Sequence, residues 1–203
     1  MKIILATTNR GKITELRELL AGEPIEFVSI ADATREPFEV VEDGATFEAN
    51  AIKKARAASA LTGLVALADD SGLEVDALGG MPGVRSARFA GEHASDAENI
   101  AALVAIMRKR NLVMSPARFR CAIALVDPSA SEPVVVEASC EGSVIVTPRG
   151  ENGFGYDPLF VVSGKDRTMA ELTAAEKNAV SHRARALAKM RVALIERASL
   201  PRV

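Results

Sequence analysis

The chain has no tryptophan, one tyrosine, two cysteines and two histidines among its 203 residues, and no excess of either charge. Its 25 lysines and arginines against 27 aspartates and glutamates give a formal net charge of −2. Proteins that bind DNA or RNA polymers usually carry a basic excess, so this balance disfavours a polymeric nucleic-acid partner. No apolar run approaches the ~20 residues that span a bilayer. The first run, from Ile3 to Ala6, is also too short for the core of a signal peptide, so we expect a cytoplasmic protein without a membrane partner.

The two cysteines give no sign of a disulfide or a metal site. Cys121 and Cys140 lie in strand-like segments with no metal-ligand spacing around them, so we expect reduced thiols in the core. With 48% hydrophobic and 26% charged residues, the composition is that of an ordinary globular domain. A chain of this length buries roughly 70% of the surface that its unfolded form exposes, which suffices without disulfides or structural metals. We therefore predict a single domain over residues 1–203.

The hydrophobic pattern alternates between strand and helix periods. Short apolar runs predict buried strands at residues 2–7, 25–30, 64–68 and 159–162. A period near 3.6 predicts helices over 13–20, 47–61, 95–110 and from 173 onward, the last two opened by the capping boxes Ser95-x-x-Glu98 and Thr173-x-x-Glu176. A period of two within 117–146 predicts antiparallel strands, and residues 78–91 are too rich in glycine for anything but a loop. This order is typical of an α/β layer fold.

The first candidate site is the junction between the first strand and the first helix, Thr7-Thr8-Asn9-Arg10-Gly11-Lys12. A strand-to-helix turn presents free backbone N–H groups and the positive end of a helix, where phosphates bind in α/β folds. A P-loop does not fit, because Ala6 stands at the position of its first glycine and Ile13 at the position of its Mg²⁺-binding hydroxyl. The alternative is an ordinary turn in which Asn9 caps a helix.

The second candidate is Asp69-Asp70-Ser71-Gly72, which follows an all-apolar strand. Adjacent carboxylates at the end of a buried strand repel each other and lose hydration, so a compensating charge is required. Mg²⁺ supplies such a charge and binds one or two carboxylates together with water and phosphate oxygens. Glu42, in the acidic segment before the second helix, could add another oxygen ligand. The alternative interpretations are a polar turn for the aspartates and a solvated loop for Glu42.

Two further candidates lie near the C-terminal end. The segment Gly153-Phe154-Gly155-Tyr156-Asp157-Pro158 holds the only tyrosine, and an aromatic ring between glycines can stack on a base. The segment Glu176-Lys177-Asn178-Ala179-Val180-Ser181-His182-Arg183 offers Lys177 and Arg183 as donors to a phosphate and a carbonyl oxygen. The alternatives are a glycine turn with an inward aromatic, and a basic helix face.

Taken in series, these segments resemble the inosine triphosphate pyrophosphatase family. The resemblance spans nearly the whole chain and follows the family's order. Its motifs are Leu5-Ala6-Thr7-Thr8-Asn9-x-x-Lys12, Thr46-Phe47-Glu48-x-Asn50-Ala51-x-x-Lys54-Ala55, Ala68-Asp69-Asp70-Ser71-Gly72-Leu73, Gly79-Gly80-x-Pro82-Gly83, Ser86-Ala87-Arg88, Gly91-Glu92, Phe154-Gly155-Tyr156-Asp157-Pro158 and Glu176-Lys177-Asn178-x-x-Ser181-His182-Arg183. It implies an α/β fold, two-lobed within a single domain, around a long mixed β-sheet with flanking helices and an active-site cleft between the lobes. It also implies a homodimer.

The resemblance further implies a role for each matching residue. Thr7 to Lys12 would hold the triphosphate, with Lys53 as a further phosphate contact. Glu42 and Asp70 would bind Mg²⁺, and Asp70 would also accept the proton of the attacking water; Asp43 remains the alternative to Glu42. The substrate contacts implied in the later segments are Ser71, Phe154, Gly155, Tyr156, Asp157, Lys177, His182 and Arg183, of which His182 and Arg183 would read the purine.

The activity implied is hydrolysis of ITP, dITP and XTP to a nucleoside monophosphate and pyrophosphate. Two alternatives stay open on the sequence alone. A related pyrophosphatase could act on pyrimidine or modified nucleotides with the same phosphate-binding residues. A nucleotide sensor would bind without hydrolysis, but it would have no need of a water-activating carboxylate.

Overall fold

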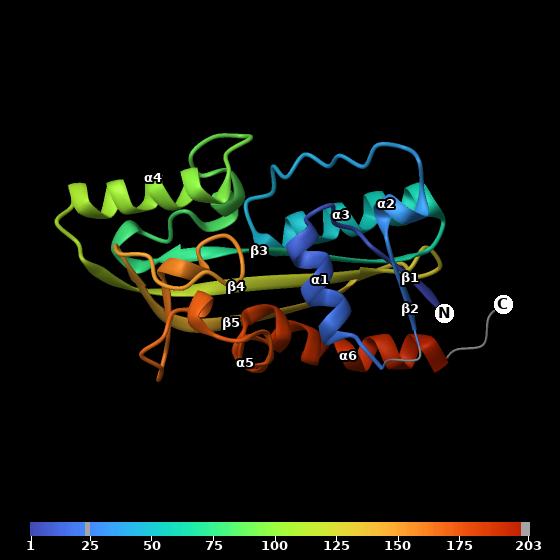
Figure 1. The fold of residues 1–203 in the computed structure, drawn as a ribbon. Helices are drawn as coiled ribbons and strands as arrows, with labels where there is room; N and C mark the ends of the chain where they lie inside the picture. Colours follow the sequence, from blue (N-terminus) through green and yellow to red (C-terminus); the bar gives the residue numbers. More distant parts are fainter. Residues whose placement is uncertain (23–24, 200–203) are drawn as a thin grey trace. The chain divides into compact units, whose positions relative to one another are not determined.

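The computed structural model describes residues 1–22 and 25–199, whose helices and strands confirm the predicted α/β class (Figure 1). No helix in this described part is both long and apolar enough to cross a lipid bilayer. In chain order the elements are β1 (Lys2–Leu5), α1 (Arg10–Leu19), β2 (Glu26–Ser29), α2 (Ile30–Ala33), α3 (Phe47–Thr62), β3 (Val65–Val75), the 3₁₀ turns η1 (Asp76–Leu78) and η2 (Gly83–Arg88), α4 (Asp96–Lys109), β4 (Met114–Val126), β5 (Val134–Ile145), η3 (Asp157–Leu159), β6 (Phe160–Val162), η4 (Met169–Glu171), α5 (Ala174–Val180) and α6 (His182–Ser199).

The strands of the described residues form one mixed sheet of six, in the order β2-β1-β3-β4-β5-β6. Strand β1 pairs in parallel with β2 and β3, whereas β5 pairs antiparallel with β6. Ile3, Ile4 and Leu5 of β1 have 0% exposure, as expected for a parallel strand covered on both faces. The mixed sheet with flanking helices is therefore confirmed.

The chain forms two compact units. The first comprises Met1–Asp70, Cys121–Ala138 and the segment that begins at Ala184. The second comprises Ser71–Arg120 and Ser139–Arg183. Strands β3, β4 and β5 each contribute residues to both units, and the change from one to the other falls between Asp70 and Ser71 within β3.

The first unit has an apolar core between its parallel strands and helices α1 and α6. Leu5, Leu16, Leu67 and Leu187 are buried in this core, together with Cys121. Helix α1 begins after an N-cap residue, Asn9, whose side-chain oxygen accepts a hydrogen bond from the backbone N–H of Lys12 at 3.0 Å. Asn9 therefore caps α1, and a capped helix start can still bind an anion.

The second unit has its own core around β4, β5 and α4. Leu73, Leu103, Phe119 and Phe160 are buried there, as is Cys140. Both cysteines are free and buried, as predicted. Helix α4 begins with the predicted capping box, in which the Ser95 hydroxyl accepts from the Glu98 N–H and the Glu98 carboxylate accepts from the Ser95 N–H.

The predicted end of this strand at Ala68 is wrong, and so is the alternative of a polar turn at Asp69–Gly72, because the strand continues through these residues to Val75. Leu73 and Val75 are both fully buried, so the apolar pattern resumes at once beyond the polar residues. A strand can keep two carboxylates in its interior only if cations neutralise them, and lysines do so here. The aspartates therefore belong to the middle of a strand.

Two smaller expectations also differ from the structure. The C-terminal helical region is divided at Ser181, whose extended backbone separates α5 from α6. The glycine-rich segment 78–91 contains the 3₁₀ turn η2 and the end of η1. In each case local backbone geometry is decided by tertiary contacts that a periodicity does not contain.

Candidate active site

Two adjacent carboxylates of β3 form the centre of the first group of polar residues. Both aspartates are buried: Asp69 is 1% exposed and Asp70 is 5% exposed. The Lys12 Nζ lies 3.0 Å from an Asp69 oxygen, and the Lys54 Nζ lies 3.0 Å from Asp70 Oδ1. The start of α1 and the middle of α3 thus each supply one ammonium group to this pair. Lys12, from the predicted phosphate-binding junction, therefore lies beside the aspartate pair.

Lys54 and Asn50 connect the same carboxylate to the acidic segment before α3. The Lys54 Nζ also lies 3.1 Å from Glu42 Oε1, so Glu42 and Asp70 meet at one cation. The fully buried Asn50 accepts from the Gly44 N–H at 2.8 Å and donates to Asp70 Oδ2 at 3.1 Å. Both oxygens of Asp70 consequently have a donor that fixes the orientation of the carboxylate.

Asn50 and Lys54 were given no role by sequence reasoning, although both stand in the quoted motif. A signal was available in the helical register of α3. Asn50 and Lys54 are four residues apart and share the buried face with Phe47, Ala51 and Ala58. A polar side chain and a lysine on the apolar face of a helix need buried partners, and such partners often belong to a functional site.

Burial is the largest influence on Asp70 and raises the pKa of its carboxyl above the usual value, although Lys54 and Lys12 act in the opposite direction. Burial alone would lower the pKa of Lys54. The combined negative charge of Asp70, Asp69 and Glu42 outweighs it, and the pKa of the Lys54 ammonium is raised. Lys54 therefore stays protonated, as a positive counter-charge for the group.

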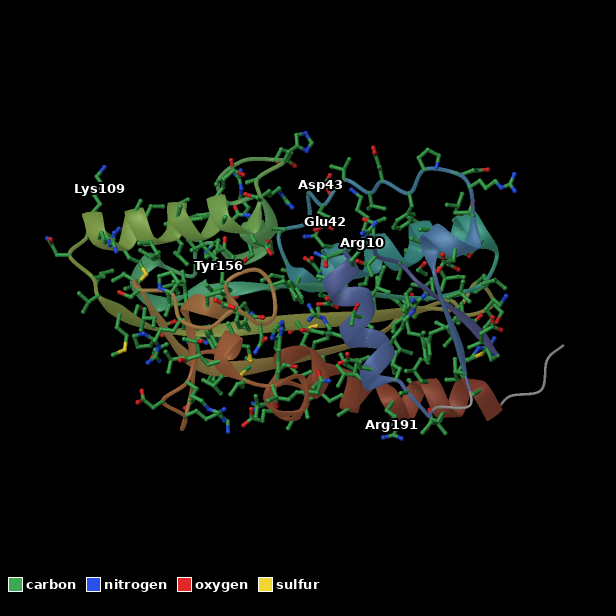
Figure 2. All side chains as sticks on the ribbon, viewed as in Figure 1. Arg10, Glu42, Asp43, Lys109, Tyr156 and Arg191 are labelled. Atoms are coloured by element: carbon green, nitrogen blue, oxygen red, sulfur yellow. The ribbon has the colours of Figure 1, made fainter. Side chains whose placement is uncertain are left out.

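The exposed residues of the acidic segment form a separate pair. Lys53 Nζ lies 2.7 Å from Asp43 Oδ1, and these side chains are 44% and 69% exposed. Lys53 also holds the pKa of the Asp43 carboxyl below its usual range. Figure 2 shows Glu42 and Asp43 on the segment that leads into α3 and Arg10 at the start of α1. Of the two alternative metal ligands, Glu42 is thus the one that shares a cation with Asp70.

The donor set fits a hard divalent cation. Glu42 and Asp70 place carboxylate oxygens within 3.1 Å of one positive atom, so both reach a common point. Among the described residues no cluster of three or more aspartate, glutamate, histidine or cysteine side chains could hold a metal. Two carboxylates are nevertheless what Mg²⁺ uses when substrate phosphates and water complete its shell.

The junction before α1 presents polar groups at the start of a helix. Thr7 Oγ1 accepts from the Asn9 N–H at 3.2 Å, and Thr8, Asn9 and Arg10 are exposed. Gly11 and Lys12 are partly buried in the first turn of the helix. Backbone N–H groups and the positive helix end are therefore accessible to an anion here.

The second group of polar residues lies in the second unit and surrounds Phe154. The guanidinium of Arg183, a residue only 1% exposed, donates to Ser71 Oγ at 3.0 Å and lies 5.6 Å from the centre of the Phe154 ring. The Lys177 Nζ lies 4.8 Å from the same ring centre and 2.6 Å from Asp157 Oδ2. The half-buried ring is thus held beside two cations.

The loop that carries Phe154 depends on glycines and on buried acceptors. Gly153 and Gly155 have φ values of 78° and 59°, which favour glycine. The Phe154 N–H donates to Asp157 Oδ2 at 3.0 Å. Tyr156 points into the core, where its hydroxyl donates to the Ser86 carbonyl at 2.9 Å and burial raises its pKa. The inward aromatic that was weighed for this loop is therefore Tyr156, and Phe154 is the ring left half-exposed.

His182 begins α6 as a buried residue whose ring stacks on Phe119 at 4.8 Å between centres. It lies next to Arg183 in the chain, in the same unit as Phe154. The described structure thus assembles two groups: one with Lys12, Glu42, Asp69 and Asp70, and one with Ser71, Phe154, Asp157, Lys177 and Arg183. The ring of His182 instead packs on Phe119 in the core of the second unit.

Comparison with known proteins identifies close relatives over almost the full length. The family model described as the Ham1 family matches residues 3–193. A protein of Geobacter sulfurreducens named dITP/XTP pyrophosphatase is 50% identical over 190 residues, which cover 94% of each chain. One of the same name from Bacillus subtilis is 47% identical over 92% of this chain and 93% of its own.

Solved structures of similar proteins have the same fold. A HAM1 protein from Coxiella burnetii superposes with a TM-score of 0.86 at 43% identity, covering 97% of this chain and 99% of the other. A nucleoside-triphosphatase, dITP/XTP pyrophosphatase, from Mycobacterium abscessus gives a TM-score of 0.74 at 50% identity, covering 94% and 98%.

Replacing each of the two neighbouring lysines of α3 should change the stability of the protein by a different amount. We expect Lys54→Met to lower the free energy of unfolding by about 3–5 kcal/mol, because Glu42 and Asp70 then lose a buried counter-charge. Lys53→Met, which removes a lysine from an exposed pair, should leave the free energy of unfolding nearly unchanged. Urea unfolding of the two variants measures the difference, and equal losses would contradict the role given to Lys54.

The deficit of Lys54→Met should also depend on pH. Without the lysine, the native pKa of Asp70 rises further above the unfolded one, because a cation that lowers this pKa is lost. A native state that binds more protons than the unfolded state becomes less stable as pH rises. The deficit against wild type should therefore shrink as pH falls through the raised pKa of Asp70. A deficit that stays constant between neutral and acidic pH would show that packing, and not charge, is lost.

Proposed function

Because this chain belongs to the Ham1 family, we propose that it hydrolyses non-standard purine nucleoside triphosphates, namely ITP, dITP and XTP, and so removes them from the nucleotide pool. At the coarser level the chain is a nucleoside-triphosphate pyrophosphatase, a hydrolase. The observation that supports the finer proposal is the meeting of Glu42 and Asp70 at one cation beside Lys12. The first group of residues would bind the phosphates, and the second group would recognise the base.

The start of α1 would bind the phosphates. Thr7, Thr8, Asn9, Arg10, Gly11 and Lys12 offer hydroxyls, an amide, backbone N–H groups and two cationic side chains. The positive helix end adds to their attraction for a polyanion. An incoming phosphate would compete with Asp69 for the Lys12 ammonium, and Lys53 would be a further phosphate contact from α3.

Glu42 and Asp70 would hold Mg²⁺. The ion would supply charge neutralisation at the phosphate oxygens and orientation of a water molecule. Lys54 now lies between the same two carboxylates, and its flexible stem allows its ammonium to shift as the cation arrives. Asn50 keeps Asp70 oriented in either case, because its amide donates to Oδ2.

Asp70 would act as the general base. Its carboxylate accepts a proton from water, and the water oxygen forms a bond to the α-phosphorus as the bond from that phosphorus to the α,β-bridging oxygen breaks. The electron pair of the broken bond leaves with pyrophosphate, and the other product is the nucleoside monophosphate. Most of the catalysis in such a displacement comes from positioning and electrostatics. The raised pKa of Asp70 favours proton acceptance.

The second group would recognise the base. Phe154 would provide a face for stacking on the base, and Lys177 and Asp157, which hold its loop, would add contacts to the nucleotide. Arg183 and His182 would donate to the oxygen at the purine 6-position, which adenine replaces with an amino group. Ser71, bonded to Arg183, would add a contact, while Gly155 and the buried Tyr156 shape the loop. The mismatch with adenine gives a polar site its selectivity.

The family resemblance and the near-neutral charge also lead us to propose a cytoplasmic homodimer. The net charge of −2 favours a small substrate over a polymeric nucleic acid.

Asp70→Asn should reduce turnover of ITP by at least ~10²-fold, because an amide cannot take the proton of water. Turnover is measured as pyrophosphate release, with circular dichroism to confirm that the fold is retained. Asp43→Asn is the matched control, since Asp43 also contacts a lysine but is exposed, and it should keep nearly full turnover. Near-normal turnover by Asp70→Asn would refute the assignment.

A panel of triphosphates tests the base-reading residues. With Mg²⁺ present, ITP and XTP should be hydrolysed up to ~10⁴-fold more efficiently than ATP. Arg183→Met should narrow this ratio by weakening ITP hydrolysis while leaving ATP hydrolysis low. Equal efficiency on ITP and ATP would contradict base recognition through the 6-oxygen. Higher efficiency on UTP or dTTP than on ITP would favour the pyrimidine alternative.

A further inference from the structure

The loop that carries Phe154 has an anchor that no motif includes. Gly153 and Gly155 flank the ring, and both adopt left-handed backbone conformations. Glycine has the largest conformational freedom of any residue, so such a loop keeps one shape only if other groups hold it. The groups that hold the two N–H donors at its tip are carboxylates.

The first carboxylate belongs to the site already described. Asp157 Oδ2 accepts from the Phe154 N–H at 3.0 Å and from Lys177 at 2.6 Å. Asp157 is buried, and Lys177 neutralises its charge. The bond from the Phe154 N–H closes the loop on itself, because the two bonded residues are three positions apart. The ion pair with Lys177 ties the base of the loop to α5, and the tip at Gly155 has a separate acceptor.

The second carboxylate comes from a distant part of the sequence. Asp96, the first residue of α4, accepts from the Gly155 N–H through Oδ2 at 2.7 Å. Asp96 and Gly155 are 59 positions apart, and both belong to the second unit. A hydrogen bond to an ionised acceptor is shorter and stronger than one between neutral groups. The N-terminal end of α4 therefore holds the tip of the aromatic loop.

Helix α4 is itself fixed at this end. Its capping box closes on Ser95 and Glu98, and the buried Asn99 accepts from the Ala90 N–H and donates to the Ala87 carbonyl. Tyr156 makes a second connection between the loop and this region, since its hydroxyl donates to the carbonyl of Ser86, next to Ala87. The anchor of Gly155 thus belongs to a rigid part of the unit.

We propose that Asp96 is a positioning residue for base recognition: through the Gly155 N–H it holds Phe154 where the nucleotide base stacks. This inference rests on the proposed function, because it assigns Phe154 to the base. It extends that function to a residue outside the family motifs. Asp96 itself touches no reacting atom. Its removal should therefore weaken nucleotide binding and leave the chemical step unchanged.

The test compares Asp96→Ala with Glu98→Ala. Both variants remove a carboxylate from the first turn of α4, but Glu98 bonds to Ser95 and not to the loop. We expect Asp96→Ala to raise the KM for ITP about 3- to 10-fold, as the loss of one orienting hydrogen bond allows, with kcat unchanged. Glu98→Ala should leave both constants near wild type, because Asn99 still holds this end of α4 and Asp96 keeps its bond to Gly155. Asp96→Asn, which keeps an oxygen acceptor, should recover most of the lost affinity.

Hydrogen exchange gives a readout that does not depend on activity. The Gly155 amide should exchange faster in Asp96→Ala than in wild type or Glu98→Ala. Equal KM values in the two alanine variants would overturn the proposal, as would a parallel fall in kcat or a faster Gly155 exchange with an unchanged KM. If the wild-type chain does not hydrolyse ITP, the proposed function fails instead, while the exchange rates still decide whether Asp96 holds the loop.

Discussion

Two carboxylates buried side by side in the middle of a strand are the constraint on which the first unit depends. Asp69 and Asp70 repel each other and lose hydration, and both effects are costly in an interior of low polarity. Lys12 and Lys54 offset this cost at 3.0 Å each. The lysines come from two helices, so the charge balance fixes the start of α1 and the middle of α3 against β3. The middle of β3 is thereby held beside the N-terminus of α1, whose positive end attracts anions.

The same charge balance is compatible with the ion site that we propose. A divalent ion held by Glu42 and Asp70 would take the place of the Lys54 ammonium, which contacts both carboxylates in the described structure. Asn50 is neutral and bonds to Asp70 from another direction. The carboxylate can therefore change its cationic partner without losing its orientation.

The second unit repeats this arrangement at smaller scale. Asp157 and Lys177 form a buried pair, and the pair orders a glycine loop and its aromatic ring. Arg183 is enclosed beside the ring and bonded to Ser71, so its planar donors are held in one direction. In both units buried charge pairs fix polar groups in place, and such fixed groups lose little entropy when a substrate binds.

Much of the fold and many of the candidate site segments can be predicted from local sequence patterns. The features that cannot be predicted have physical reasons. Capping boxes, the strand-helix order and the candidate segments depend on residues near in sequence, and a resemblance of motifs added their roles. The continuation of β3 through Asp69 and Asp70 depends on lysines from other elements, which no window of sequence contains. Lys54 was open to prediction from its place on the buried face of α3, where its neighbour Lys53 points to solvent. The Asp96 anchor joins residues 59 positions apart and leaves no periodic signal.

The central claim is that Asp70 directs water to the α-phosphorus of a bound triphosphate. Hydrolysis of ITP in water enriched in oxygen-18, followed by mass spectrometry of both products, tests this most directly. Attack at the α-phosphorus puts the label in the phosphate of IMP and leaves the pyrophosphate unlabelled. Label in pyrophosphate, or release of orthophosphate with IDP, would show attack at another phosphorus and would contradict the role given to Asp70.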